Sequence, residues 1–306
     1  MSSAQQKYDA VFSPFNFEND VLYREWRDQK LEGYPTNLGD LLVEINDPRS
    51  LTESEHDALL QRCRKTNMAL YASTTGTDTD PEIPLAMARC FGLQQINKNW
   101  LADETGLTSL TVRDDGVRQD YIPFSNRHIN WHTDGYYNQA AKQIHALNLH
   151  VTQQAASGGE NALMDHEIAY ILLREKNPDF IRALMDDSAM TIPARIDEGG
   201  KVARQEEPGP VFSIMPSGDL HMRYTIRVNN VIWADDPASR EALATLEEIL
   251  NSDSPYIFRG RLESGMGLVS NNVLHDRAAF SDDATHKRHY YRARYFDRLA
   301  GTGIAD

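Results

Sequence analysis

A histidine and an aspartate separated by one residue, His132 and Asp134, are the first candidates for chemistry in this sequence. In an extended segment successive side chains point to opposite faces, so the imidazole and the carboxylate share one side while Thr133 points to the other. Both side-chain types bind divalent metals. The pair alone is equally compatible with an ordinary surface strand, because a metal site needs at least one further ligand.

His275 is the best candidate for a third ligand among the ten histidines of the chain. It lies where a predicted strand ends in a turn, whereas His145 and His150 lie in an apolar strand and are expected to be buried and hydrogen-bonded. Two histidines and one carboxylate leave three metal positions open, which is typical of Fe(II) sites that activate oxygen. Zinc hydrolases use the same ligand types, so both metals remain open at this point.

Three arginines, Arg288, Arg292 and Arg294, lie at even spacing in the segment 286–296 and share one face if this segment is a strand. Guanidinium groups on a buried face need anionic partners, because unpaired buried charges are costly. The arginine fork also matches a carboxylate with two hydrogen bonds. If the strand lies at the surface instead, the same face is simply solvated.

The His-x-Asp pair, the later His275 and the arginine segment, in that order, resemble the Fe(II)/2-oxoglutarate-dependent oxygenases of the TauD/TfdA (taurine dioxygenase-like) family. The resemblance runs from about Leu51 to Phe296. It includes Trp131 before the first ligand, and Gly158 and Gly159, which are similar to the family's glycine pair after its second core strand. It implies a mainly β fold with flanking helices: a double-stranded β-helix, or jelly roll, of the clavaminate synthase type.

The resemblance also implies which side chains hold the cofactors. His132, Asp134 and His275 are expected to bind Fe(II). Arg288 is expected to bind the distal carboxylate of 2-oxoglutarate. Asn161, where the taurine enzyme has a threonine, is expected to donate a hydrogen bond to the other end of this co-substrate. The implied reaction consumes O2, releases succinate and CO2 and hydroxylates a C–H bond; an aspartate at position 134 leaves no ligand position for a halide.

The substrate implied by the resemblance is small and anionic. Arg292 falls on the position that binds the sulfonate in the taurine enzyme, and Arg294 and Tyr137 are further candidate substrate contacts, so a carboxylate or sulfonate is expected. The segment around His275 and its distance to Arg288 are closer to the γ-butyrobetaine hydroxylase branch. That branch's cysteine-rich zinc module has no counterpart in a sequence with two cysteines.

Two alternatives have different consequences. A zinc-dependent hydrolase that uses the same His/Asp/His ligands would be active without O2 or 2-oxoglutarate. A non-catalytic β-sandwich binding protein would keep its ligand affinity after substitution of the three candidate ligands.

The elements that must position these residues are mostly short β segments. Period-two and apolar patterns predict strands at 41–45, 68–71, 109–112, 129–133, 144–151, 189–192, 211–214, 220–226, 256–258, 267–270 and 289–296. Helical spacing and capping patterns predict helices at 52–65, 84–91, 165–176, 179–185 and 237–250. Many short strands with few helices favour a closed or sandwich-like β structure over a parallel sheet. We expect one catalytic oxygenase domain over residues 1–306, with 1–50 as an ordered N-terminal lead-in.

Net charge and cysteine content limit the classes of binding partner and the cellular location that we expect. The chain has 31 Lys and Arg against 45 Asp and Glu, a formal charge of −14, which disfavours binding to nucleic acid and to anionic membranes. Cys63 and Cys90 form neither a disulfide framework nor a zinc-finger pattern, and the first residues lack the apolar core of a signal peptide. No run approaches the ~18 apolar residues of a membrane span. We therefore expect a cytoplasmic enzyme with a small-molecule substrate, and leave homo-oligomerisation open.

Overall fold

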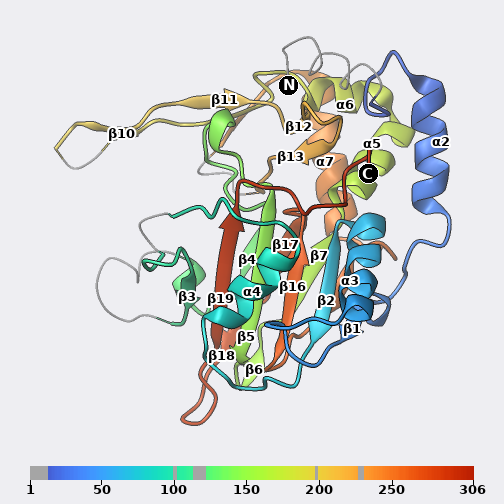
Figure 1. The fold of residues 1–306 in the computed structure, drawn as a ribbon. Helices are drawn as coiled ribbons and strands as arrows, with labels where there is room; N and C mark the ends of the chain where they lie inside the picture. Colours follow the sequence, from blue (N-terminus) through green and yellow to red (C-terminus); the bar gives the residue numbers. More distant parts are fainter. Residues whose placement is uncertain (1–12, 99–101, 113–121, 197–198, 227–230) are drawn as a thin grey trace.

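The larger of the two main β-sheets, with six strands, forms the centre of the protein (Figure 1). The computed structural model describes residues 13–98, 102–112, 122–196, 199–226 and 231–306. Neighbouring strands of this sheet run antiparallel, except for the first pair. In order across the sheet, the strands are β1 (Leu42–Glu44), β2 (Met68–Ala72), β16 (Met266–Ser270), β5 (Ala146–Gln153), β19 (His289–Tyr295) and β3 (Thr108–Leu110).

The smaller sheet carries the predicted histidine ligands. Along the chain, the strands β4, β7 and β17 of this sheet alternate with β5, β16 and β19 of the larger one. This alternation is the double-stranded β-helix that the family resemblance implies. Its order is β15 (Phe258–Gly260), β7 (Asn161–Met164), β17 (Leu274–Arg277) and β4 (Ile129–His132). A separate antiparallel pair is formed by β18 (Phe280–Ser281) and β6 (Ser157–Gly158).

Helix α3 (Glu53–Thr66) begins at the predicted capping box. The Thr52 hydroxyl accepts a hydrogen bond from the backbone N–H of Glu55, whose carboxylate accepts one from the backbone N–H of Thr52. The helix ends at Asn67, which has a left-handed φ of 58°. Buried side chains of α3 and of α4 (Glu82–Cys90) form a hydrophobic cluster with the larger sheet. These two helices therefore cover one face of that sheet.

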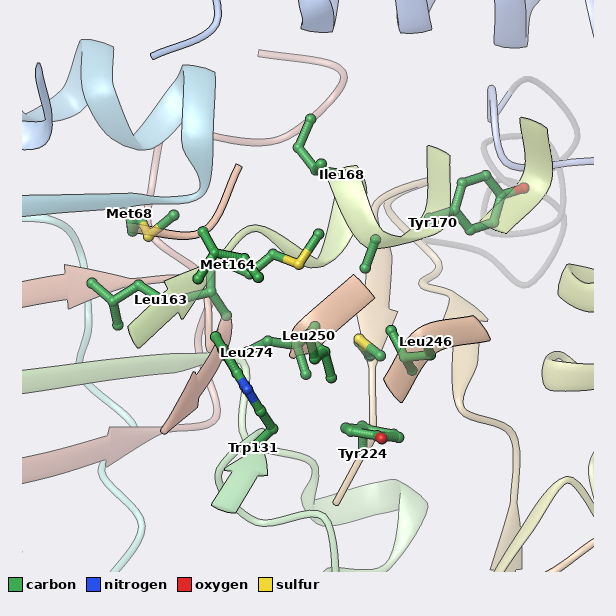
Figure 2. Packing of buried hydrophobic residues seen from close by; sticks show 14 of the residues in the cluster. Met68, Trp131, Leu163, Met164, Ile168, Tyr170, Tyr224, Leu246, Leu250 and Leu274 are labelled. Atoms are coloured by element: carbon green, nitrogen blue, oxygen red, sulfur yellow. The ribbon is translucent and has the colours of Figure 1, made fainter. Parts of the chain in front are cut away.

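Strand alternation separates the predicted ligands from the core. Trp131 on β4 and Leu274 on β17 each immediately precede a predicted histidine ligand and so point to the opposite face. Figure 2 shows both in a hydrophobic cluster with Leu246 and Leu250 of α7. The helices that contribute to this cluster include α5 (His166–Lys176), α6 (Pro178–Leu184) and α7 (Pro237–Leu250).

The N-terminal lead-in contains a helix, α2 (Asp20–Leu31), that the sequence patterns did not predict. It packs on α5: the ring of Tyr23 lies 6.2 Å from the ring of Tyr170, and the ring of Phe15, which precedes α2, lies 5.3 Å from it. Residues 1–12 of the predicted lead-in lie outside the described residues. The remaining helical turns are η1 (Leu38–Leu41), η3 (Ile122–Phe124) and η4 (Ala140–Lys142).

The segment between α6 and α7 is more broken than predicted. The predicted strand 220–226 stops at residue 222. Tyr224 instead hydrogen-bonds to Thr133, just after β4, and Ile226 hydrogen-bonds to Trp131 within β4. The strands of this segment are β8 (Met190–Ile192), β9 (Arg195–Ile196), β10 (Val202–Arg204), β11 (Glu207–Gly209), β12 (Phe212–Ile214), β13 (Leu220–Met222) and β14 (Ile232–Trp233). Most other predicted elements begin and end within two residues of the observed bounds. Among the described residues, no helix has the length and apolar character needed to cross a bilayer.

Candidate active site

Strand pairing brings the three predicted metal ligands together. β4 and β17 are antiparallel, with His275 directly opposite His132, and their rings are 4.3 Å apart between centroids. Ligand atoms of His132, Asp134 and His275 all lie within 4.8 Å of one another. Asp134 lies in a turn just after β4 rather than within the strand. No other group of three such side chains lies as close within the part of the chain that the structure describes.

Backbone carbonyls orient the two imidazoles. Nδ1 of His132 lies 2.9 Å from the carbonyl oxygen of Asn130, and Nδ1 of His275 lies 2.9 Å from that of Val273. A carbonyl oxygen only accepts, so Nδ1 carries the proton in each ring and Nε2 is the nitrogen with a lone pair for a metal. Metal-binding histidines are commonly oriented by such a second hydrogen bond. The donor set therefore fits a divalent cation.

Asp134 is held in place through its backbone. The side chain of Asn272 accepts a hydrogen bond from the Asp134 N–H at 2.8 Å, and donates to the carbonyl oxygens of Asp134 at 2.9 Å and of Ile144 at 2.7 Å. Gly135, which follows, has a φ of +70°, and a Cβ there would lie 2.4 Å from the Ile144 side chain. Only glycine fits this turn, so the turn after the ligand is fixed by sequence as well as by Asn272.

The carboxylate of Asp134 is buried and remains ionised. Burial by itself would raise its pKa, but the guanidinium groups of Arg292 and then Arg294 outweigh burial and hold the pKa well below its usual range. Oδ1 lies 3.2 Å from Arg292 and 3.9 Å from Arg294. Oδ2 is buried and has no hydrogen-bond partner among the described residues. A buried anionic oxygen in this state is costly, and a divalent cation would satisfy it.

Arg288 fits the predicted carboxylate-binding role. Its side chain is 4% exposed, and its guanidinium lies 3.6 Å from the ring centroid of Tyr290 and 5.2 Å from that of Phe280. Among the described residues, no carboxylate lies within ion-pair distance of it. The carboxylate of Asp282 accepts a hydrogen bond from the backbone N–H of Arg288 and forms no ion pair with its guanidinium. A buried guanidinium with aromatic neighbours and no ion-paired carboxylate is suited to bind a carboxylate ligand.

The glycine pair noted in the sequence lies beside this arginine. A Cβ on Gly158 would lie 2.4 Å from the carbonyl oxygen of Ala279, and one on Gly159 would lie 3.4 Å from Cβ of Phe280 and 4.0 Å from Nε of Arg288. Gly158 also has a φ of +71°. The pair therefore allows β6 to approach β18 closely.

The predicted substrate residues lie together near Asp134. Arg292 forms the ion pair with Asp134, while Arg294 donates hydrogen bonds to the Tyr137 hydroxyl at 2.9 Å and to Oδ1 of Asn97 at 3.0 Å. Asn97 was not a candidate in the sequence, because nothing local indicates that residues 96 and 97 bridge to the end of β19. Contact of these residues with a substrate stays a prediction.

Asn161, the second predicted co-substrate contact, lies on β7. Its Nδ2 donates to the backbone carbonyl oxygen of Asp276 at 3.1 Å, which uses one of its two amide protons. Its Oδ1 is buried without a partner in the described part of the chain. The predicted hydrogen bond from Asn161 to 2-oxoglutarate stays a prediction.

Arg277 is a buried residue of this region that the sequence did not single out. It lies on β17 opposite Asn161, is 4% exposed, and its guanidinium lies 4.9 Å from the ring centroid of Phe280. Burial, reinforced by the nearby charge of Arg288, lowers the pKa of Arg277 to about 9. Its spacing could have revealed it, since a residue two after His275 in a strand shares the face of that ligand.

Comparison with known proteins assigns the family. The sequence model described as "Taurine catabolism dioxygenase TauD, TfdA family" matches residues 34–294. A uridine-5'-phosphate dioxygenase from Amycolatopsis sp. is 31% identical over 174 residues; the match covers 54% of this chain and 60% of that relative, less than two thirds of its length. The predicted closeness to the γ-butyrobetaine hydroxylase branch is not confirmed.

Solved structures with the same fold are oxygenases of low sequence identity. An asparagine oxygenase in complex with Fe(II), 3-hydroxyasparagine and succinate has a TM-score of 0.57 at 12% identity, covering 96% of this chain and 92% of its own. A taurine dioxygenase from Burkholderia xenovorans has a TM-score of 0.54 at 16% identity, covering 84% and 87%. These likenesses support the predicted fold.

Proposed function

The chain belongs to the TauD/TfdA family, and on this premise we propose that it is an Fe(II)- and 2-oxoglutarate-dependent oxygenase that hydroxylates a C–H bond of a small anionic substrate. The observation that supports this most is the group of half-buried His132 with buried Asp134 and His275, whose ligand atoms lie within 4.8 Å of one another. The names of the relatives include several dioxygenases and oxygenases and lend no support to the zinc hydrolase alternative.

The residues of this chain have distinct roles in the proposal. When bound, iron and 2-oxoglutarate supply the oxidation: O2 gives one oxygen atom to succinate and one to the substrate C–H bond, with loss of CO2. The two histidines present Nε2, because their Nδ1 protons are held by backbone carbonyls. Asp134 supplies a carboxylate that neighbouring arginines keep ionised. Arg288 binds the distal carboxylate of 2-oxoglutarate, and Asn161 donates to its other end.

The charge balance favours an anionic substrate. Among the described residues, the buried arginines of this region pair with one carboxylate, Asp134, through Arg292 and Arg294. The remaining positive charge near the predicted iron site is suited to a carboxylate, a sulfonate or a phosphate monoester. The name of the uridine-5'-phosphate dioxygenase supports adding a phosphate monoester to this set. Tyr137, hydrogen-bonded to Arg294, is proposed to contact the substrate.

Two measurements test the proposal in sequence. Fe(II) and 2-oxoglutarate added together without oxygen should produce a visible charge-transfer absorption band, and the H275A variant should not produce it. Carboxylates, sulfonates and nucleoside monophosphates should then be screened for substrate-stimulated succinate release. Activity that persists with zinc alone, without O2 or 2-oxoglutarate, would favour the hydrolase instead.

A further inference from the structure

Two buried arginines meet at one aromatic ring beside the predicted co-substrate site. The guanidinium groups of Arg277 and Arg288 lie 4.9 and 5.2 Å from the ring centroid of Phe280, and each side chain is 4% exposed. Arg277 donates to two backbone carbonyls, of Ser125 at 2.8 Å and of Arg127 at 2.5 Å. These carbonyls solvate one nitrogen of Arg277 but do not neutralise its charge.

This arrangement is electrostatically unfavourable without an anion. Like charges that are both removed from water repel each other, and neither Arg277 nor Arg288 has a carboxylate within ion-pair distance among the described residues. The aromatic rings of Phe280 and Tyr290 lie against these guanidinium groups. Asp282, whose carboxylate accepts a hydrogen bond from the backbone N–H of Arg288, stabilises the charge of Arg288 from beyond ion-pair distance. A doubly charged ligand would relieve the repulsion more than a singly charged one.

The position of Arg277 relates it to the same ligand. It lies on the face of β17 that carries His275, two residues further along, and directly opposite Asn161 on β7. The ring it shares with Arg288 belongs to Phe280 on β18, which packs against Gly158 of β6 and against Gly159, the residue after β6. Arg277 is thus connected to the predicted iron site through its strand, and to the predicted carboxylate site through Phe280.

We propose that Arg277 is a positioning and specificity-determining residue. Its buried charge acts beside Arg288 to favour the distal carboxylate of 2-oxoglutarate, so that the protein selects a dianionic over a monoanionic 2-oxo acid. This inference rests on the proposed function. It assigns to Arg277 the choice of co-substrate and leaves direct contact with the distal carboxylate to Arg288.

The test compares two co-substrate analogues that differ only at the distal end. Dissociation constants of 2-oxoglutarate and of 2-oxovalerate, which lacks the distal carboxylate, are measured by calorimetry with Mn(II) in place of Fe(II). R277M removes the charge; R277Q also removes it but keeps an amide that can donate to the carbonyls of Ser125 and Arg127. R277K keeps the charge. R259M, at an exposed arginine of β15, is the control for net charge.

R277M and R277Q should raise the dissociation constant of 2-oxoglutarate by about tenfold and change that of 2-oxovalerate by less than about twofold. R277K should recover most of the affinity, and R259M should match the wild type. If the variants bind both ligands equally more weakly, Arg277 only supports the strand. If the variants bind both ligands as tightly as the wild type does, the charge of Arg277 does not act on the ligand. Either result overturns the inference. If the wild type binds neither ligand in the presence of Mn(II), the proposed function fails first. If R277M does not fold, R277Q decides the outcome.

Discussion

Replacing Asn272 by Ala removes the side chain that holds the backbone of Asp134 in place. Asn272 is 2% exposed and makes three hydrogen bonds, to the N–H and carbonyl of Asp134 and to the carbonyl of Ile144. It also has a φ of +51°, in the left-handed region that asparagine and glycine tolerate better than alanine. The N272A variant therefore loses three buried hydrogen bonds and acquires backbone strain at once.

The expected cost follows from these contacts. Each buried hydrogen bond contributes about 1 kcal/mol net, and the left-handed φ costs a non-glycine residue such as alanine about 1 kcal/mol more. We expect N272A to lower the free energy of unfolding by about 4 kcal/mol, and N272G, which has no Cβ, by about 3 kcal/mol. Because Asp134 loses its orientation, metal affinity should fall by roughly ten- to a hundredfold in both variants.

Urea unfolding of the metal-free protein, monitored by circular dichroism, measures the change in the free energy of unfolding. An anaerobic Fe(II) titration with excess 2-oxoglutarate measures the change in metal affinity. The matched control is N251A, at an exposed asparagine whose amide donates to the single backbone carbonyl of Glu247 at the end of α7. That control should lose about 1 kcal/mol or less and bind Fe(II) normally. Wild-type metal affinity in N272A would refute the idea that Asn272 positions the carboxylate.

Three further predictions concern other parts of the site and core. R288M should raise the KM for 2-oxoglutarate at least about tenfold with a smaller change in kcat, as steady-state succinate assays would show. Arg223 donates to backbone carbonyls of Tyr136, Met190 and Glu207, so R223K should raise the substrate KM through the neighbouring Tyr137 while calorimetry finds 2-oxoglutarate affinity unchanged. Burial lowers the pKa of His150 to about 4, below the unfolded value of about 6.5. As the pH falls, the unfolded state binds the proton before the folded state does, so the stability that neutral, buried His150 contributes is present above pH 6.5 and is lost as the pH falls towards 4. Urea unfolding at pH 7 and at pH 5 should therefore show that the free energy of unfolding falls by about 2 kcal/mol more in the wild type than in H150Q.

The local parts of the site could be predicted from sequence because they depend on short-range geometry. Period-two alternation placed Arg292 and Arg294 on the same face of β19, where both are buried, and the chemistry of His132 and Asp134 identified two side chains that converge. His150 was expected to be a buried, hydrogen-bonded histidine, and its Nδ1 lies 3.1 Å from the Tyr71 hydroxyl. In each case the pattern that carries the prediction is a few residues long, although the partner of His150, Tyr71, lies 79 residues away in the chain.

The supporting contacts could not be predicted because their partners are distant in the chain. Asn272 meets Asp134 only after β17 has paired with β4, and Arg277 meets Arg288 only through Phe280. No periodicity in either segment reports such a contact. The spacing of two residues between His275 and Arg277, which places both on one face of a strand, was visible in the sequence, but the burial of Arg277 beside a second cation was not.

The register between β4 and β17 is the feature on which the candidate iron site depends most. A slip of one residue would turn His275 to the opposite face, where Leu274 now packs against the helices. The pairing is not regular: between Ile129 and His132 the strand β4 advances three residues while β17 advances two, from Arg277 to His275. Such a bulge bends its strand and redirects the side chains beside it, and bulges recur next to active sites. In this protein it immediately precedes His132 and includes the carbonyl of Asn130, which fixes the imidazole. The irregularity therefore contributes to the metal geometry, because it brings His132 opposite His275 in a register that alternation alone would not give.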